Sequence, residues 1–289
     1  MVNNLFNLLI ALIMIYPLYV IIISSFSEPD AVTRGEVFLL PVGFTLEPYL
    51  NVFKEESLWI GYRNSIIYVF FGVLYDLLLT ITCAYVLSKT YLPGRKFFNW
   101  FFFITMFISG GMIPSYLLIQ NLGLLNNPLV LIIGSMSCYN MIVCRSYFMS
   151  SINESMYEAA AIDGASEIQR FIRIALPLSK PIIAVIALFN AVGRWNSYMN
   201  ALLYIYNRNW HPLQVFLREI LVTAERKLQA VLADSGATED AIMRAMREAE
   251  LAQTMKYSLV FIACAPLLIA YPFVQKHFVK GIMIGSIKG

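Results

Sequence analysis

Long apolar segments alternate with short polar ones along most of this 289-residue chain. A helix needs about 20 consecutive, mostly apolar residues to cross the hydrocarbon core of a bilayer. Six segments reach or approach that length, and they predict six transmembrane helices over residues 5–26, 61–87, 97–120, 129–148, 182–206 and 257–274. Within the third segment, Ser109-Gly110-Gly111 and Pro114 predict a kink or an unwound turn. We therefore expect an all-α integral membrane protein.

The first apolar segment, residues 5–26, could also be a cleavable secretory signal. It lacks a basic stretch in front of it, and its apolar run is longer than the about 7–15 residues of such a signal. We interpret it as a transmembrane helix.

The longest change in this pattern is a polar stretch over residues 151–181. Ser151 and Glu154 have the spacing of a capping box, and Ser166 and Gln169 repeat it, which predicts two short helices that begin near residues 152 and 167. Gly164 lies between them and suits a left-handed turn. Two prolines, Pro177 and Pro181, should end the second helix and begin the next element.

An ordered set of residues runs through this stretch: Glu158-Ala159-Ala160, Asp163-Gly164-Ala165, Phe171, Ile174, Leu176-Pro177 and Pro181. The set resembles the EAA loop of binding-protein-dependent ABC importer permeases, from which it departs at Asn153, where proline is frequent. Three further matches resemble the carbohydrate-uptake branch, and the maltose-type or alginate-type second permease in particular: Ser109–Pro114, Asn121–Leu124 and Lys280–Ser286.

The resemblance covers nearly the whole chain and implies a single permease domain with the type I ABC importer fold, six transmembrane helices and a cytoplasmic pair of coupling helices. It implies that the loop over residues 151–177 docks on the ATPases and that the loop over residues 207–253 reaches the binding protein. The residues to which it assigns ATPase coupling are Glu158, Ala159, Ala160, Asp163, Gly164, Phe171, Leu176 and Pro177.

By the same resemblance, the chain is one half of a two-permease pore, and we expect a heterodimer. Its other partners would be two ATPase subunits and an extracytoplasmic solute-binding protein. ATP and magnesium would bind to the ATPases, so the chain itself would hold no cofactor or metal and would not be an enzyme. The expected location is a bacterial cytoplasmic membrane, and the expected substrate is an oligosaccharide.

A second polar pattern follows the fifth apolar segment. At 100° per residue, seven residues fall within an arc of about 160° on one helix face: Asn190, Gly193, Arg194, Asn196, Ser197, Asn200 and Tyr204. Amides offer donors and acceptors together and aromatic faces stack on sugar rings, so this face predicts a pathway for a hydroxyl-rich ligand. Tyr139 and Asn140 of the fourth segment, and Tyr116 and Gln120 of the third, are further candidates.

Arg194 leaves two alternatives open. A charge at the centre of a membrane helix costs at least about 2.5–3.5 kcal/mol, so it should face a partner or a cavity. If it pairs with Asp76, the rest of the lining is neutral and a neutral oligosaccharide is favoured. If it faces the pore unpaired, it favours an acidic oligosaccharide, such as an alginate or other uronate fragment.

Charge predicts the orientation. The short connection over residues 88–96, the polar stretch and the C-terminal tail carry lysines and arginines, whereas the short turn over residues 121–127 carries none. The positive-inside rule therefore places the polar stretch and both termini in the cytoplasm. In the loop over residues 207–253 acidic residues offset the basic ones, and we expect it outside the cell, with an amphipathic helix over residues 239–252.

Composition excludes several classes of protein. Hydrophobic residues make up 59% of the chain and charged ones 13%, with a dispersed net charge of +3, which argues against a nucleic-acid partner. The four cysteines have no C-x-x-C spacing and read as free thiols. No phosphate-binding P-loop is present, so an ATP-driven transporter would need a separate ATPase. The remaining alternatives are an ion-coupled secondary transporter, a membrane-embedded enzyme and a permease for a non-sugar solute.

Overall fold

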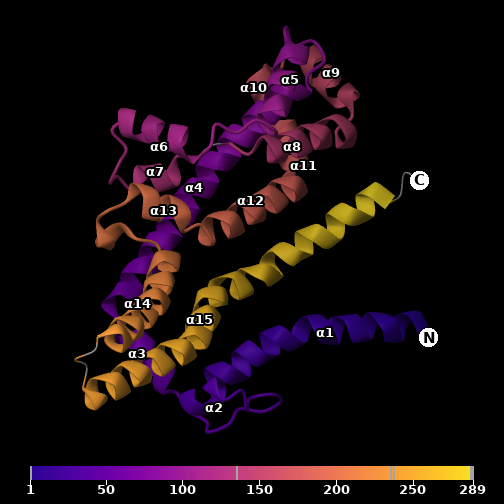
Figure 1. Ribbon diagram of the computed structural model, residues 1–289. Coiled ribbons are helices and arrows are strands. Elements are labelled where there is room, and N and C mark those ends of the chain that lie inside the picture. The colour runs from indigo at the N-terminus through magenta and orange to yellow at the C-terminus, as the bar shows by residue number, and fades with distance from the viewer. Residues whose placement is uncertain (1, 135, 235, 237, 287–289) are drawn as a thin grey trace. The chain divides into compact units, whose positions relative to one another are not determined.

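The computed structural model describes the backbone of residues 2–134, 136–234, 236 and 238–286 (Figure 1), and within those residues it is helical without strands. Side chains are described up to residue 269, apart from residues 2, 221, 224, 225, 227, 253 and 254. The side chains of the predicted C-terminal match Lys280–Ser286 therefore lie outside the described residues. The elements are α1 (Val2–Ser25), α2 (Pro29–Thr33), α3 (Glu47–Lys54), α4 (Glu56–Ser88), α5 (Arg95–Thr105), α6 (Met112–Asn121), α7 (Leu129–Ile132), α8 (Cys138–Ser151), α9 (Glu154–Ile162), α10 (Glu167–Arg170), a π-helix (Phe171–Ala175), α11 (Leu176–Leu178), α12 (Lys180–Trp195), α13 (Met199–Tyr204), a 3₁₀ turn (Arg208–Trp210), α14 (Leu213–Ala233) and α15 (Glu239–Ser286).

The chain forms two compact units. The first unit combines the chain up to Asn64 with Asn209–Leu268, and the second combines Ser65–Arg208 with the chain from Ile269 onward. Because α4 and α15 each continue from one unit into the other, both units contain parts of the long apolar helices.

Among the described residues, three helices are long and apolar enough to cross a membrane: Asn3–Ser25, Glu56–Ser88 and Glu239–Ile269. The first, second and last predicted segments lie on them. A fourth candidate arises if Glu167–Leu178 and Lys180–Trp195, which meet at 77°, are counted together. Since Glu167–Leu178 belongs to the polar stretch, we assign α12 alone of this bent pair to the membrane.

The other predicted segments are interrupted. The third breaks between Thr105 and Met112, where Gly111 has a φ of +85°, in agreement with the predicted kink. The fourth contains only the short α7 before α8 begins, and the fifth is divided between α12 and α13 at Asn196-Ser197-Tyr198. A continuous helix over the fourth or fifth segment was therefore wrong. The break in the fifth segment contains asparagine and serine, which compete for backbone hydrogen bonds, and the break in the fourth contains Gly134 and Ser137, the N-cap of α8. The total of six spans stays a prediction.

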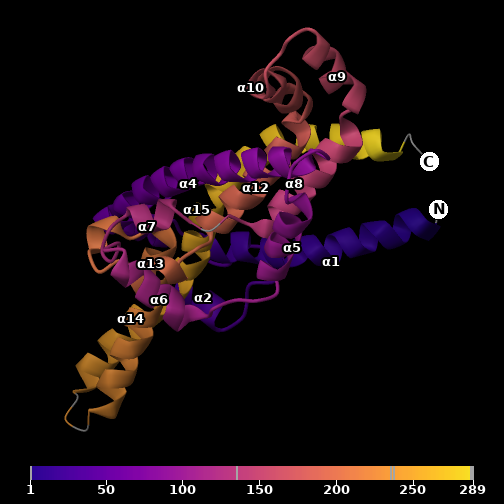
Figure 2. The same ribbon diagram turned by 90° about the horizontal axis from the view of Figure 1, so that it is seen from above.

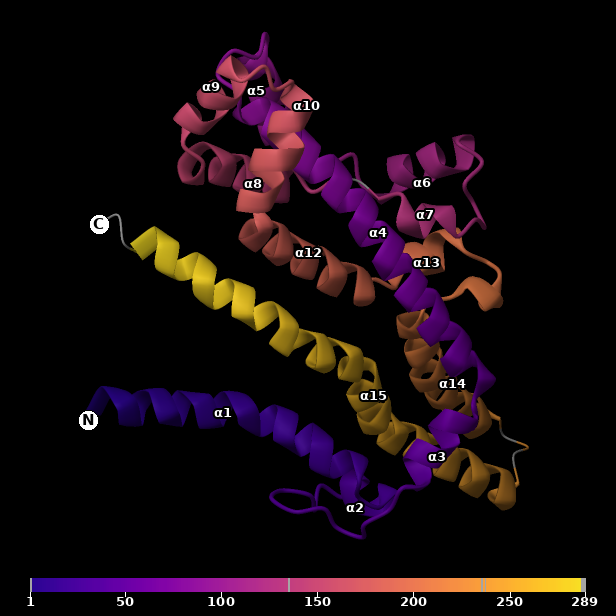
Figure 3. The ribbon, with the colours of Figure 1, turned by 180° about the vertical axis from the view of Figure 1, so that it is seen from behind.

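The core of the second unit joins α4 to the polar stretch. The other helices of the second unit form two groups along α4 (Figure 3). Helices α5, α8, α9 and α10 lie near the C-terminal end of α4, and α6, α7 and α13 lie beside its middle. The buried core side chains come from α4, α8 and the residue after it, α9, the π-helix and α12: Ile81, Ala84, Tyr85, Leu87, Met141, Cys144, Phe148, Ile152, Tyr157, Ala175 and Ile186. The polar stretch is thus packed onto the membrane helices rather than hanging free.

The first unit is held together by hydrogen bonds that its buried polar side chains make. The Ser25 hydroxyl lies 2.7 Å from the Tyr49 hydroxyl, and the Ser258 hydroxyl donates to the Ser25 carbonyl at 3.3 Å. Asn64 donates to the carbonyl oxygens of Asn209, at 2.8 Å, and His211, at 3.0 Å. These bonds connect α1 to α3 and α15, and they connect the start of α4 to the segment before α14. The connection over residues 207–253 is largely helical, in α14 and the start of α15, and the start of α15 at Glu239 agrees with the amphipathic helix predicted over residues 239–252.

Candidate functional site

The first helix of the polar stretch, α9, begins at Glu154 rather than near residue 152. Its N-cap is Asn153, whose side-chain oxygen accepts a hydrogen bond from the Ser155 backbone at 3.2 Å. The capping box predicted for Ser151 and Glu154 was therefore wrong. Asparagine is as good an N-cap as serine, and its extended backbone places it directly before the helix. Ser151 instead ends α8.

The turn and the start of the second helix agree with the prediction. Gly164 has a φ of +80°, which side chains rarely tolerate. Ser166 and Gln169 form both bonds of a capping box, at 2.9 and 3.3 Å, so α10 begins at Glu167. This geometry fixes the direction in which the chain returns after α9.

The prediction that Pro177 ends the second helix was wrong. The chain continues through the π-helix and α11 to Leu178, and the sharp bend of 77° follows Ser179. Pro177 lies in the first turn of α11, where a missing backbone N–H is tolerated, and the wider π-helix before it accommodates the proline ring. Pro181 lies in the first turn of α12, which begins at Lys180, in agreement with the prediction that it starts the next element.

The α9–α10 hairpin, which lies beyond the end of α8 (Figure 2), presents both polar and apolar side chains to its surroundings. Ile162 is 87% exposed and Ile168 70% exposed, which is unusual for isoleucines in a polar segment. Of the predicted coupling residues, Phe171 and Leu176 pack against the core and Ala160 is half-buried. The others are exposed: Glu158, Ala159, Asp163, Gly164 and Pro177. The hairpin therefore has an inner apolar base and an outer mixed face.

A buried lysine connects α9 to the end of α4. Lys89 is 8% exposed, and its ammonium group lies 3.2 Å from the ring centre of Tyr157 and 4.5 Å from that of Tyr85. Burial lowers the pKa of Lys89, and the nearby Glu167 carboxylate opposes that shift. Cation–π contacts of this kind stabilise by about 0.5–2 kcal/mol. Sequence reasoning missed this contact, although a lysine directly after an apolar helix is a signal for it.

Glu167 forms a second connection. Its carboxylate accepts hydrogen bonds from the hydroxyls of Tyr85, at 3.0 Å, and Tyr91, and it pairs with Arg170 at 3.1 Å. Burial acts to raise the pKa of Glu167, but the hydrogen bonds from Tyr91 and Tyr85 and the charge of Arg170 together lower it. The start of α10 is thereby tied to the end of α4 and to the 88–96 connection.

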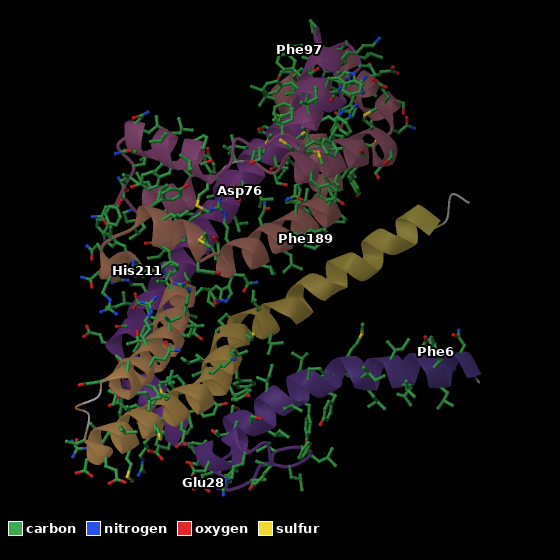
Figure 4. The ribbon with its side chains drawn as sticks, viewed as in Figure 1. Phe6, Glu28, Asp76, Phe97, Phe189 and His211 are labelled. Atoms are coloured by element: carbon green, nitrogen blue, oxygen red, sulfur yellow. The ribbon has the colours of Figure 1, made fainter. Side chains whose placement is uncertain are left out.

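The membrane-embedded part contains an ion pair between α12 and α4. The Arg194 guanidinium donates to both carboxylate oxygens of Asp76, at 2.8 and 2.9 Å, and to the Leu131 carbonyl at 2.7 Å. Asp76 lies on the middle part of α4 (Figure 4). A methyl group on Gly72 would lie 2.5 Å from the guanidinium, and one on Gly134 would lie 2.9 Å from it. Two glycines thus make room for Arg194, and the alternative of an unpaired Arg194 was wrong.

The predicted polar face does not continue beyond α12. Asn190 accepts a hydrogen bond from the Asn140 amide at 2.9 Å, which connects α12 to α8. Because the helix ends at Trp195, the periodicity that grouped these residues fails after that point. Tyr204 is buried and stacks on Tyr116 with ring centres 6.1 Å apart. The remaining candidates are partly or largely exposed: Gly193, Asn196, Ser197, Asn200, Tyr139 and Gln120.

Comparisons with known proteins identify the family. Residues 1–220 match the family described as binding-protein-dependent transport system inner membrane component. The chain belongs to this family. As a member, it is the transport permease subunit of an ABC importer rather than an enzyme, and it is a membrane protein. An ion-coupled carrier and a membrane-embedded enzyme are thereby excluded.

Relatives of this permease match over nearly its full length. Protein LplC of Bacillus subtilis is 40% identical over 96% of this chain and 90% of its own. The polygalacturonan/rhamnogalacturonan transport system permease protein YtcP of the same organism is 35% identical over the full length of both. Among solved structures, a chain of a bacterial ABC transporter involved in the import of the acidic polysaccharide alginate superimposes with a TM-score of 0.81 at 34% identity, covering 96% of this chain and 95% of that one. The all-α permease fold is therefore the fold of this chain.

Proposed function

We propose that this permease forms part of the pore of an ATP-driven importer for acidic oligosaccharides, such as fragments of uronate polymers. The observation that carries the proposal is the similarity over 96% of the chain to a permease of a transporter for the acidic polysaccharide alginate. The relative YtcP, named for polygalacturonan and rhamnogalacturonan, supports the same class of substrate. Since Arg194 is paired with Asp76, it supplies no free charge for such a substrate, and the acidic units must be recognised elsewhere.

We further propose that two ATPase subunits, which bind ATP and magnesium, dock on the α9–α10 hairpin. The exposed Ile162 and Ile168 suit an apolar pocket, and the exposed Glu158 suits a basic partner. The inner base of the hairpin packs on α4 and α12, so a displacement of the hairpin would be passed to the membrane helices. In this proposal the hairpin and both termini are cytoplasmic, and α14 with the start of α15 faces the solute-binding protein. A second, homologous permease completes the pore.

The ATPase activity of the purified importer tests the choice of substrate. Binding protein loaded with an oligogalacturonate or oligoalginate should stimulate ATP hydrolysis, whereas an uncharged oligosaccharide of the same length should not. Stimulation by the uncharged sugar alone would contradict the acidic substrate class and leave the importer assignment intact. No stimulation by any loaded binding protein would contradict the importer assignment for this complex.

A further inference from the structure

Two arginines converge on one backbone oxygen at the end of α4. The Nε atoms of Arg95, in the first turn of α5, and Arg145, in α8, each donate to the Leu87 carbonyl at 3.1 Å. Leu87 lies in the last turn of α4, where carbonyl groups have no partner within the helix and carry the negative end of its dipole. The backbone therefore holds the two guanidinium groups next to each other.

The charges of this arginine pair are not matched by a carboxylate. Within the part of the chain that the structure describes, no carboxylate lies within ion-pair distance of Arg95 or Arg145. The other described partner of Arg95 is the uncharged sulfur of Met149, at 3.3 Å. Two adjacent cations repel each other, and half-buried charges without a counter-ion are costly. The negative partial charge at the end of one helix offsets less than one of the two guanidinium charges. The pair therefore favours the binding of an anion.

A cavity of about 240 Å³ opens between α5 and α8, and Arg145 is the member of the pair that lines it. Arg145 and the Asn99 amide supply hydrogen-bond donors, and the rest of the lining consists of Trp100, Phe103 and Ile142. One part of the cavity thus suits an anionic group with several acceptor oxygens, and the other part suits a hydrocarbon chain. A small free anion would use only the first part.

The cavity lies where a membrane surface is expected. The first turn of α5, marked by Phe97 in Figure 4, is at the end of the unit that carries the α9–α10 hairpin. Tryptophan gathers at membrane interfaces, and Trp100 is 64% exposed. In the proposed orientation this is the cytoplasmic leaflet, whose anionic lipids attract basic residues. The neighbouring Lys96 adds a further positive charge.

We propose that the cavity between α5 and α8 binds an anionic phospholipid, with the head-group phosphate on Arg145 and Asn99, next to the charge of Arg95, and an acyl chain along Trp100 and Phe103. The bound phosphate supplies the missing counter-charge and fixes α5 and α8 at the end of α4. The site is separate from the proposed ATPase-docking face and from the Arg194–Asp76 pair.

The test uses the whole importer complex in nanodiscs with equal amounts of phosphatidylglycerol and phosphatidylcholine. Native mass spectrometry after release into mild detergent measures which lipid stays bound. The wild-type complex should retain phosphatidylglycerol in preference to phosphatidylcholine. The double variant Arg95→Gln/Arg145→Gln should retain at least about tenfold less, since the charge-assisted hydrogen bonds of Arg145 and the neighbouring charge of Arg95 are lost. Arg173→Gln, which removes an exposed cation of the same membrane end, should retain as much as the wild type.

Folding and the source of the anion are controlled separately. Arg95→Lys/Arg145→Lys keeps both charges and should retain most of the bound phosphatidylglycerol, and Trp100→Ala should weaken retention without a change of charge. Equal retention by the wild type and the Gln double variant would overturn the proposal. Displacement of the lipid by millimolar inorganic phosphate would also overturn it, because it would assign the site to a free anion. A cross-link from position 99 to a partner subunit, with no lipid retained, would assign the arginines to a protein contact instead.

Discussion

Lys89 shows how a single side chain can connect the docking hairpin to the membrane helices. It is buried between the rings of Tyr85 on α4 and Tyr157 on α9. A side chain of similar length without the charge would keep the packing but lose the cation–π attraction. Lys89 is therefore a positioning residue, whose effect on transport would act through the placement of α9.

The substitution Lys89→Met should weaken coupling while it preserves assembly. We expect the ratio of sugar imported to ATP hydrolysed to fall several-fold, because α9 is held less firmly against α4. Proteoliposome uptake and ATP hydrolysis, measured on the same preparation, give this ratio. Lys89→Arg, which keeps a cation over the rings, should restore most of it, and an unchanged ratio in Lys89→Met would contradict the positioning role.

The Glu167 carboxylate gives the hairpin a dependence on pH. Its pKa in the folded protein lies below the ordinary value of 4.5, so its stabilising contribution is fully present above pH 4.5 and is lost as the pH falls through the lowered pKa. Hydrogen exchange of residues 154–178, corrected for the intrinsic effect of pH, should therefore stay slow at pH 5 and accelerate only at a pH below 4.5. Glu167→Gln should remove this step. An acceleration centred above about pH 5 in the wild type would contradict the assignment.

The Arg194–Asp76 pair is expected to stabilise the permease rather than to bind substrate. Arg194→Gln alone leaves a buried carboxylate without its partner, which should cost about 3–5 kcal/mol and reduce the yield of assembled complex. The double variant Arg194→Gln/Asp76→Asn should recover assembly, as measured by size-exclusion chromatography and thermal unfolding. Failure of the double variant together with normal assembly of Arg194→Gln would contradict the structural role.

The glycines beside Arg194 allow an independent test of the same pair. A methyl group on Gly72 would lie 2.5 Å from the guanidinium, whereas one on Gly193 meets nothing within 4 Å. Gly72→Ala should therefore lower the thermal unfolding temperature, and Gly193→Ala should leave it equal or raise it, since alanine favours a helix by about 1 kcal/mol over glycine. Equal effects of the two substitutions would show that the guanidinium does not lie against Gly72.

At the scale of elements, the α9–α10 hairpin combines a rigid base with an exposed tip. The base consists of Phe171 and Leu176 against the core, and the tip carries Glu158, Ile162 and Ile168. Rigid connection at one end and exposure at the other are what a lever between an ATPase and a pore requires. The left-handed turn at Gly164 determines how the two helices diverge.

Changes at the tip should uncouple the importer without unfolding it. Glu158→Ala should leave the protein in the membrane and reduce ATP-driven uptake at least about tenfold, because a charge-assisted contact with the ATPase is lost. Gly164→Val should have a similar effect through strain at a φ of +80°. Ser155→Ala, on the exposed part of the same helix, is the control and should transport normally. Near-normal transport in Glu158→Ala and Gly164→Val would contradict the coupling role.

Elements with a strong local signal were the ones that the sequence could predict. The long apolar run of α4, the Ser166–Gln169 capping box and the Gly164 turn were correct because each depends on residues close together in the chain. The Ser151 cap failed because Asn153 offered an equivalent cap two residues later. The prediction of one polar helix face over the fifth segment failed because the helical period cannot be applied across the break after Trp195.

Contacts between distant segments could only be seen in the structure. The cation–π contact of Lys89, the convergence of Arg95 and Arg145 on Leu87, and the pairing of Asn140 with Asn190 each join residues from different parts of the chain. Even the Arg194–Asp76 pair, which the sequence offered as one of two alternatives, needed the geometry of α4 and α12 to be decided.

At the scale of the whole molecule, α14 and the start of α15 are the elements proposed to meet the binding protein. This connection is largely helical, in α14 and the start of α15, and so can present an ordered surface to a partner. Deletion of residues 225–250 should abolish stimulation of the ATPase by loaded binding protein and spare assembly with the other subunits. Unchanged stimulation would refute this role for the segment.

Uptake by the reconstituted importer tests the proposed function most directly. Proteoliposomes that contain this permease, its partner permease and the ATPases should accumulate a labelled oligouronate only when ATP is on the side of the ATPases and loaded binding protein is on the opposite side. We predict that Glu158→Ala lowers this accumulation at least about tenfold while Ser155→Ala preserves it. Accumulation that persists without ATP, or that an ion gradient alone can drive, would contradict the importer mechanism.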